Sequence, residues 1–313
     1  MEIYRDFSEP MGVRGATVAM GNFDGVHLGH QSVLTLAKEA VPDAAWGCIT
    51  FEPHPRRLFQ PDAPEFRLMS AAARSHRLEM LGLDVLYEVP FTRELSALSP
   101  EEFVEELLVQ SMGISHVVVG SDFRFGKGRA GDLRSLRSLG DAAGFGVTEA
   151  PLIAQEGREI SSTAIRAALA RGAPREAAEM LGHWHRLEGP VLHGFKRGRE
   201  LGFPTVNVSL DDLHLPKFGV YAVLVDVLSG PHAGRYQGAA SIGVRPMFDD
   251  QTAPNLEAYL FDFEGDLYDQ SISVALVDFL REEETFDTLE AFIAQMHADC
   301  DRARALLSTR QSN

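Results

Sequence analysis

The sequence MGNFDGVHLGH, residues 20–30, joins a short apolar segment at residues 16–20 to a segment with helical spacing at residues 31–40. This order predicts a strand, a glycine-bearing loop and a helix. Gly21 and Gly25 permit backbone angles that other residues resist, so the loop can pass close to a ligand. The first turn of the helix offers unpaired N–H groups and a partial positive charge, which favour a phosphate group at this point.

Two histidines end this stretch. His27 and His30 are three residues apart, so both rings face the same side of a first helical turn, and Gly29 adds no side chain between them. Two imidazole donors at a helix N-terminus suit the charge that develops on a phosphate under attack. An isolated His-x-x-His pair is more often a surface feature or part of a metal site, but the strand, glycines and helix around this pair favour phosphate chemistry. Zinc is disfavoured, because the chain has only Cys48 and Cys300 and no H-E-x-x-H run.

Length and composition limit the class of protein. A chain of 313 residues is long enough for two domains, and its 45% hydrophobic and 24% charged residues are typical of a soluble globular protein. No stretch approaches the roughly 20 apolar residues of a membrane span, and the first ten residues hold no apolar signal core. Two cysteines make no disulfide framework. We therefore expect a cytoplasmic protein without a membrane partner.

The net charge of −16 disfavours a nucleic-acid partner. It also makes local basic clusters notable. Two of the four lysines, Lys127 and Lys196, lie in loops rich in glycine and arginine. Such loops indicate either a local anion or an ordinary solvated turn, and the composition does not choose between them.

The first half of the chain alternates expected strands and helices. Strands are predicted at residues 16–20, 46–51, 85–89, 116–119 and 146–149, and helices at residues 31–40, 71–81, 100–111 and 133–143. Strands separated by helices of about 10 to 15 residues predict a parallel sheet with crossover helices. Ligands bind beyond the carboxyl ends of such strands, so we expect three loops to converge on one crevice. These loops are residues 20–30, 51–55 and 120–126.

The segment ISSTAIR, residues 160–166, predicts the start of another helix. A plain N-cap is the common explanation for hydroxyl residues at such a point. Three consecutive hydroxyls, Ser161, Ser162 and Thr163, exceed what one cap needs. Together with the planar cation of Arg166 they would hold a phosphate well.

The second half changes character near residues 181–184. Short β-rich segments separated by Gly, Pro and Asp turns predict a small antiparallel barrel, and a final segment at residues 289–307 predicts a helix. The expected strands are residues 187–193, 205–208, 220–227, 237–244, 256–261 and 272–280.

Three polar residues in this half suggest chemistry. Thr205 and Asn207 are two apart and point to the same side of a strand. Their oxygens are hard ligands that suit a Mg²⁺ shared with nucleotide phosphates. Glu257 lies on another expected strand, where a carboxylate could take the proton of an attacking hydroxyl. Thr and Asn are also common beside turns and a strand Glu is usually solvated, so these residues alone leave both explanations open.

Taken together, the chain resembles the bacterial bifunctional riboflavin kinase/FMN adenylyltransferase (FAD synthetase) family over nearly its whole length. The order of the matching runs makes the resemblance specific. These runs are GNFDGVHLGH, FEPHP, VVVGSDFRFGKGRAGD, ISSTAIR, HGFKRGRELGFPTVN, FGVYAV, SIGVRPMF, LEAYLFDF, DLYDQSI and FLREEETFDTLEAF. The resemblance implies an α/β chain: a Rossmann-like nucleotidyltransferase domain with a parallel sheet at residues 1–183, then a riboflavin kinase domain at residues 184–313, a small antiparallel β-barrel with a terminal helix.

The resemblance also implies the reactions and the small molecules. The second domain would phosphorylate riboflavin with ATP to give FMN, and the first would adenylylate FMN with a second ATP to give FAD and pyrophosphate. ATP and Mg²⁺ would be required, with FMN as the intermediate. The sequence leaves the oligomeric state open.

Roles for individual residues follow from the same resemblance. His27 and His30 match the residues that steady the ATP phosphates, Thr205 and Asn207 match the Mg²⁺ ligands, and Glu257 matches the proposed base. Residues that would bind nucleotide are Gly21, Asn22, Phe23, Asp24, Gly25, Gly29, Asp122, Ser161, Ser162, Thr163 and Arg166 in the first half, and Gly194, Lys196, Gly198, Arg199 and Gly202 in the second. Residues of the segment resembling a flavin-binding flap are Arg281 and Phe286. Departures from the family pattern are His183, Val206 and Met247, where arginine, alanine and threonine are usual.

Three other classes of protein share part of this pattern. A monofunctional FMN adenylyltransferase with an inert barrel is disfavoured because Thr205, Asn207 and Glu257 are all present. An aminoacyl-tRNA synthetase-like or cytidylyltransferase enzyme shares the His-x-Gly-His pattern, but a synthetase would want a lysine-rich second signature and a less acidic chain. A non-catalytic flavin-binding protein would not need the paired histidines.

Overall fold

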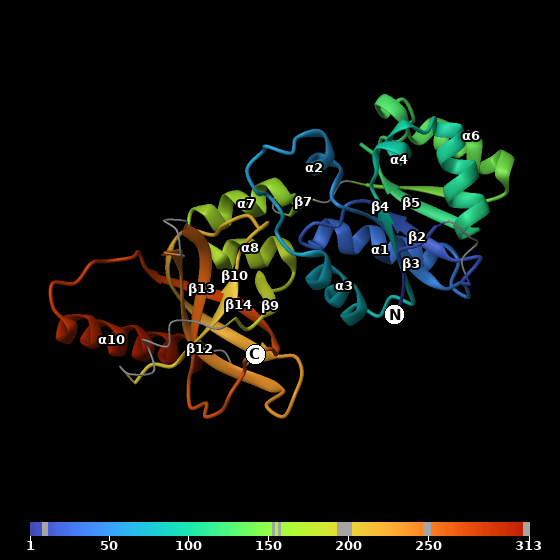
Figure 1. Ribbon diagram of the computed structural model, residues 1–313. Coiled ribbons are helices and arrows are strands. Elements are labelled where there is room, and N and C mark those ends of the chain that lie inside the picture. The colour runs from blue at the N-terminus through green and yellow to red at the C-terminus, as the bar shows by residue number, and fades with distance from the viewer. Residues whose placement is uncertain (8–11, 152–153, 156–157, 193–201, 247–251, 309–313) are drawn as a thin grey trace. The chain divides into compact units, whose positions relative to one another are not determined.

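The computed structural model describes residues 1–7, 12–151, 154–155, 158–192, 202–246 and 252–308 (Figure 1). Its packing divides the chain into two compact units. The first comprises Met1–Pro64 and Arg74–Ile160, and the second comprises Glu65–Ala73 and Ser161–Asn313. These units are defined by packing. The predicted boundary at residues 183/184 divides the two activities instead, and it stays a prediction.

The first unit is built on a six-stranded sheet. Its strands pair in parallel in the order β1-β4-β3-β2-β5-β6 (Figure 1). The strands are β1 (Glu2–Tyr4), β2 (Thr17–Met20), β3 (Trp46–Glu52), β4 (Val85–Pro90), β5 (His116–Gly120) and β6 (Gly146–Ala150). All four residues of β2 are buried, as expected for a central parallel strand covered on both faces. The predicted parallel sheet is confirmed.

Helices cover both faces of this sheet. On one face, Thr17 donates its hydroxyl to the Ala37 carbonyl of α1 (Leu28–Ala40) at 2.6 Å. On the other face, Val18 packs in one core with Leu107 and Leu108. The remaining helical segments before residue 160 are α2 (Pro55–Phe59), α3 (Ala71–Met80), α4 (Arg93–Ala97), α5 (Pro100–Glu102), η1 (Phe103–Met112), η2 (Lys127–Arg129) and α6 (Leu133–Ala143).

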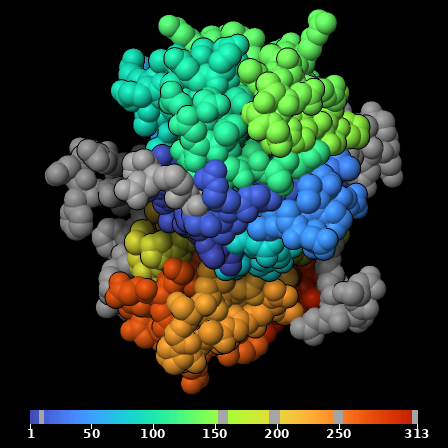
Figure 2. Space-filling model, turned by 90° about the vertical axis from the view of Figure 1, so that its right-hand side faces the viewer, coloured from blue at the N-terminus to red at the C-terminus, as the bar shows by residue number. Residues whose placement is uncertain are grey.

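The helix expected at residues 100–111 begins as predicted but changes geometry. The side chain of Ser99 caps the backbone N–H of Glu102, and the carboxylate of Glu102 accepts from the Ser99 N–H. From Phe103 to Met112 the helix is π-helical. Arg14 donates to the carbonyl oxygens of Val109 and Gln110 near its end, at 3.1 Å each. Figure 2 shows blue atoms of the N-terminal part of the chain beside teal atoms.

The strand order places a topological switch point beside β2. From β2 the chain passes to β3 on one side and later returns to β5 on the other. In open α/β sheets, ligands bind beyond the carboxyl ends of the strands at such a point. The loops that leave Met20 and Gly120 both start at this edge.

The second unit contains an antiparallel six-stranded sheet in the order β10-β13-β12-β11-β14-β9. The strands are β9 (Arg186–Pro190), β10 (Thr205–Ser209), β11 (Gly219–Val227), β12 (Gly234–Pro246), β13 (Thr252–Leu260) and β14 (Ser271–Arg281). The backbone N–H of Leu192, just after β9, donates to the Asn207 carbonyl of β10 at 2.8 Å, which brings the two edges together. The predicted small barrel is confirmed.

Alternation along β11 separates the inside of the barrel from its outside. Tyr221, Val223 and Val225 point into the barrel core. Ala222 packs instead with Ala303 of the terminal helix α10 (Leu289–Ser308), which lies along the outside of the barrel (Figure 1). Helices α7 (Ser162–Ala170) and α8 (Pro174–Leu181) also belong to this unit. A short two-stranded sheet, β7 (Ala154–Gln155) with β8 (Arg158–Glu159), precedes them in the chain and belongs to the first unit.

No helix among the described residues combines the length and the apolar character that crossing a membrane would need.

Candidate active sites

The loop after β2 is held in an unusual backbone conformation. Phe23, Gly25 and Val26 have φ of 51°, 86° and 43°, all in the left-handed region. For Val26 this conformation is strained, since a β-branched side chain resists it. The side-chain Nε2 of Gln31 donates to the Val26 carbonyl at 2.9 Å, and the Val26 N–H donates to the Phe23 carbonyl at 3.1 Å. The loop is therefore fixed by its own contacts with the helix that follows.

His27 and His30 lie together at the start of α1, as predicted. The Nδ1 atom of His27 accepts from the backbone N–H of His30 at 3.3 Å, so His27 is the N-cap of the helix. Because Nδ1 accepts, the proton of a neutral His27 ring is on Nε2. The two rings stack with 3.6 Å between centroids and 17° between planes. A Cβ on Gly29 would come 3.1 Å from two atoms of the His27 ring, so any other residue there would crowd the stack.

The ring of His30 differs from an exposed histidine in its pKa and in its hydrogen bonding. Burial, and then the charge of His27, hold the pKa of His30 well below 6.5. The Nδ1 atom of His30 is buried, and it has no hydrogen-bond partner in the part of the chain that the structure describes. A buried polar atom without a partner costs free energy, which a ligand that pairs with it would recover. An oxygen of a bound phosphate is one acceptor that would pair with a protonated Nδ1.

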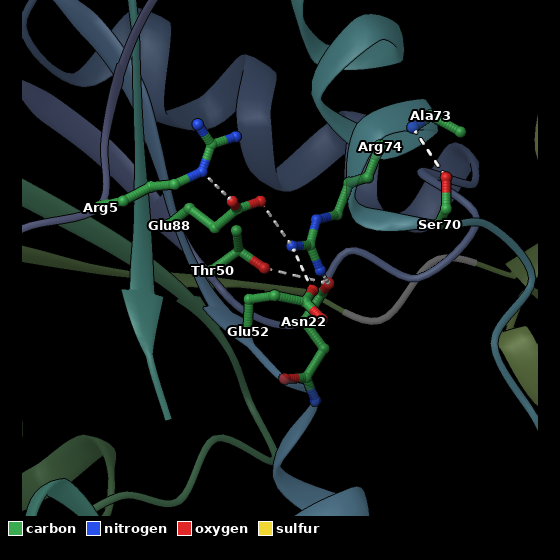
Figure 3. A network of polar contacts seen from close by, with 8 residues as sticks. All are labelled: Arg5, Asn22, Thr50, Glu52, Ser70, Ala73, Arg74 and Glu88. Atoms are coloured by element: carbon green, nitrogen blue, oxygen red, sulfur yellow. Dashed lines mark hydrogen bonds and ion pairs between the residues drawn. The ribbon is translucent and has the colours of Figure 1, made fainter. Parts of the chain in front are cut away.

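A buried polar network underlies the same loop. The Asn22 carbonyl accepts from the Thr50 hydroxyl at 3.2 Å and from Arg74 at 3.4 Å (Figure 3). Arg74 also pairs with Glu88 on β4. Sequence reasoning missed this network, although one signal was present: Glu88 stands inside the apolar strand VLYEVP, and a buried carboxylate needs a partner.

The other predicted nucleotide residues of the first unit lie around this loop and after β5. Asp24 is buried and is 4% exposed. Asp122 is exposed, and its Oδ1 would lie 3.1 Å from a Cβ on Gly120, so glycine leaves this carboxylate room beside the end of β5.

Ser161, Ser162, Thr163 and Arg166 belong to the second compact unit. The Ser161 hydroxyl accepts from the Ala164 N–H at 3.3 Å and caps α7. Arg166 donates through Nε to the Phe66 carbonyl, and its guanidinium lies 5.5 Å from the Phe66 ring centre. The structure therefore accounts for one hydroxyl as a cap and for part of the guanidinium as a packing contact.

In the barrel, Asn207 and Glu257 lie opposite each other on the paired strands β10 and β13. Asn255 links them: its Nδ2 donates to Asn207 Oδ1 at 2.9 Å and to Glu257 Oε1 at 3.4 Å. Asn207 and Asn255 are buried, with 5% and 7% exposed. Sequence reasoning missed Asn255, yet its place two residues before Glu257 puts both side chains on one side of β13.

Thr205 stands two residues before Asn207 on β10, which agrees with the predicted shared side. Among the described residues, no three His, Cys, Asp or Glu side chains lie close enough to hold a metal ion. Hydroxyl and amide oxygens are a different donor set. Gly202 has a φ of 84° just before this strand. The predicted residues Gly194, Lys196, Gly198 and Arg199, and also Met247, lie outside the described residues.

The two residues predicted to bind flavin lie next to α10. Arg281 donates to both carboxylate oxygens of Asp299, with its Nη2 2.8 Å from Oδ2. Its guanidinium lies 5.7 Å from the Phe286 ring centre, and Phe286 pairs edge-on with Phe292 at 5.7 Å. In this structure Arg281 thus fastens the end of β14 to the terminal helix.

The fold and these sites define a class of protein: a transferase with one nucleotidyltransferase-like unit and one barrel unit suited to phosphate transfer. Comparisons with known proteins agree. The family model for FAD synthetase matches residues 10–164, and the model for riboflavin kinase matches residues 181–307. A Pseudomonas fluorescens protein is 41% identical over 295 residues, covering 94% of this chain and 93% of the relative. A Listeria monocytogenes protein is 36% identical over 295 residues, covering 93% and 92%.

Both relatives are named bifunctional riboflavin kinase/FMN adenylyltransferase. The chain belongs to this family, with both modules in one polypeptide, so the predicted bifunctional enzyme is confirmed over the monofunctional alternative. The crystal structure of a macrolide-efflux protein from Streptococcus pneumoniae superimposes with a TM-score of 0.81 and 29% identity, over 95% of this chain and 96% of that chain. This similarity concerns the fold. The efflux function belongs to the name of the S. pneumoniae protein and is not transferred to this chain.

Proposed function

We propose that the two stacked histidines carry adenylyl transfer and that the Asn207–Asn255–Glu257 group carries riboflavin phosphorylation. In the first reaction an oxygen of the FMN phosphate attacks the α-phosphorus of ATP. The bond from that phosphorus to the bridging oxygen breaks, and pyrophosphate leaves with the electron pair. The attacking phosphate is already ionised, so positioning and charge stabilisation carry this step and no protein base is needed.

His27 and His30 would donate hydrogen bonds to the triphosphate in this step. Two observations support this role: Nδ1 of His30 has no partner among the described residues, and the helix begins at this point. A triphosphate would also favour the protonated form of His30, whose pKa the free protein keeps low. We also assign nucleotide binding for adenylyl transfer to the residues predicted from the sequence: Gly21, Asn22, Phe23, Asp24, Gly25, Gly29, Asp122, Ser161, Ser162, Thr163 and Arg166.

In the second reaction the 5′-hydroxyl of the ribityl chain attacks the γ-phosphorus of ATP. Glu257 takes the proton of that hydroxyl, the bond between the γ-phosphorus and the bridging oxygen breaks, and ADP leaves. The hydrogen bond from Asn255 at 3.4 Å holds the Glu257 carboxylate beside Asn207 and supports this assignment.

The residues present fit a Mg²⁺ ion beside this carboxylate. Thr205 and Asn207 offer a hydroxyl and an amide oxygen on one side of β10, and Mg²⁺ prefers hard oxygen ligands. The hydrogen bond that Asn207 Oδ1 accepts from Asn255 orients this amide oxygen on β10. When bound, the ion would neutralise charge on the nucleotide phosphates.

We also propose the remaining assignments made from the sequence. The adenylyltransferase is assigned to residues 1–183 and the kinase to residues 184–313, with Gly194, Lys196, Gly198, Arg199 and Gly202 at the kinase nucleotide. Arg281 and Phe286 would contact flavin once the pair with Asp299 opens. The enzyme would act in the cytoplasm on riboflavin, FMN and ATP, without nucleic acid or membrane.

The observation that carries the proposal is the stacked pair of imidazoles at the N-terminus of α1. Purified protein with riboflavin, ATP and Mg²⁺ should form FMN and then FAD, resolved by chromatography. Product that stops at FMN would contradict the adenylyltransferase assignment. Conversion of FMN but not of riboflavin would contradict the kinase assignment.

A further inference from the structure

We propose that Arg74 is a positioning residue for adenylyl transfer and that it acts through the carbonyl oxygen of Asn22. Arg74 would touch neither nucleotide nor flavin. The inference rests on the proposed role of the loop after β2, because it concerns how that loop keeps its shape.

The contacts of Arg74 are drawn in Figure 3. Its side chain is 1% exposed and lies among three acceptors. Nη2 is 3.0 Å from Glu52 Oε2 and 3.2 Å from Glu88 Oε2. Nη1 is 3.4 Å from the Asn22 carbonyl oxygen. One planar group therefore fixes two carboxylates with one nitrogen and a loop peptide with the other.

The orientation of the Asn22 carbonyl affects the conformation of the loop that follows it. Its peptide leads directly into Phe23, the first residue in the left-handed region. Thr50, which is completely buried, donates its hydroxyl to the same oxygen at 3.2 Å. Two donors, one of them charged, hold the plane of this peptide. If the plane turned, the glycine-bearing segment before His27 would move with it.

Stability alone explains the network poorly. Burying charges is costly, and replacing a buried ion pair with apolar residues is often neutral or stabilising. Glu88 is 4% exposed and already has a second cation, because Arg5 lies 2.6 Å from its other oxygen. What Arg74 adds is a rigid fork whose second nitrogen reaches the loop. Lysine carries a single nitrogen and cannot reproduce this geometry.

The main test is the paired variant Arg74→Met/Glu88→Leu, which removes the two most buried charges together and keeps Glu52 and Arg5, the more exposed members of the network. The readouts are the thermal unfolding midpoint, kcat and KM for ATP in FAD formation from supplied FMN, and FMN formation from riboflavin as an internal reference. We expect a cooperative unfolding transition near that of the parent and unchanged FMN formation. We also expect kcat/KM for ATP in FAD formation to fall about 10- to 100-fold, mainly through KM. Parental kcat/KM for ATP in a folded double variant would overturn the proposal.

Arg74→Lys keeps the positive charge beside Glu52 and Glu88 but removes the second terminal nitrogen, which reaches Asn22. This variant tests the proposal if the double variant does not fold. We expect kcat/KM for ATP in FAD formation to fall about 10-fold in this variant. Adding Thr50→Val to it should lower kcat/KM by a smaller factor than Thr50→Val does in the parent, because both changes act on the Asn22 carbonyl oxygen. Full rescue by lysine would mean that only the charge matters and would overturn the proposal.

Two further variants serve as controls. Arg137→Met removes an arginine of the same unit from an exposed pair with Glu149 and should leave every constant unchanged. His30→Ala separates the failure of this inference from failure of the proposed function. If His30→Ala abolishes FAD formation while the Arg74 variants retain it, only the inference is wrong. If His30→Ala also retains FAD formation, the role of the whole loop is wrong.

Discussion

The imidazole rings of His27 and His30 lie face to face, with centroids 3.6 Å apart. Two like charges at that separation repel strongly, and the charge of His27 is one cause of the lowered pKa of His30. The free protein therefore holds at least one neutral ring here. Negative charge from a bound triphosphate would reverse that preference, so ligand and protonation are coupled at this point.

Gly29→Ala should impair adenylyl transfer selectively. The added methyl group would lie 3.1 Å from Cε1 and Nδ1 of His27, which is closer than most Cβ contacts, so the ring must move. We expect FAD formation from FMN to fall about 10-fold or more, with FMN formation unchanged. Both rates are measured by chromatography of the flavins. Thr35→Ala, an exposed site on the same helix, is the matched control, and an equal loss in that variant would contradict this account.

Asn255→Ala should impair the kinase selectively. Without the Asn255 amide, Asn207 and Glu257 lose the donor that holds their oxygens together. We expect phosphorylation of riboflavin to fall about 10- to 100-fold, while FAD formation from supplied FMN stays at the parental rate. Asn255→Asp has nearly the same volume but no N–H donor, so it should behave like the alanine variant. A fully active aspartate variant would show that the hydrogen bonds do not matter.

The second unit should lose stability in acid because of His185. Burial, followed by the charges of His183 and His214, lowers the pKa of His185 to about 3. In the unfolded chain the imidazole of His185 takes up a proton near pH 6.5. Above that pH, the buried neutral ring therefore costs the folded state no stability. As the pH falls below 6.5, the free energy of unfolding decreases by about 1.4 kcal/mol per pH unit until the pH reaches the pKa of His185 in the folded state.

Urea unfolding between pH 7.5 and 5 tests this dependence. The chain has two tryptophans, Trp46 in the first unit and Trp184 in the second. In a Trp46→Phe background the fluorescence of Trp184 therefore reports the second unit alone. His185→Gln should flatten the pH dependence. If the slope is the same with and without His185, the assigned cause is wrong.

Much of the fold was predictable because it depends on short-range patterns. The loop and helix after β2 follow from two glycines and two histidines within eleven residues. The capping box at Ser99 follows from the spacing of a hydroxyl and a carboxylate. The barrel follows from regular β-rich segments and turns. In each case neighbouring residues carry the information.

What could not be predicted depends on contacts between distant residues. Arg166 lies against Phe66, and Arg281 against Asp299, so the predicted ligand-binding cations carry structural contacts that spacing does not show. Glu88 is visible as a charge within an apolar strand, but its partner Arg74 is on a helix fourteen residues away. The placement of Glu65–Ala73 with the second unit likewise depends on packing, for example on Leu68 beneath α7 and α8.

The central claim is that separate sites, at His27/His30 and at Asn207/Glu257, carry the two flavin reactions. The most direct test is a two-step assay on His30→Ala and Glu257→Ala, with FMN and FAD resolved by chromatography. The account predicts that His30→Ala still makes FMN but loses about 100- to 1000-fold in FAD formation. It predicts that Glu257→Ala converts supplied FMN to FAD but fails to phosphorylate riboflavin. Equal loss of both reactions in both variants, with folding intact, would contradict the assignment of one site to each reaction.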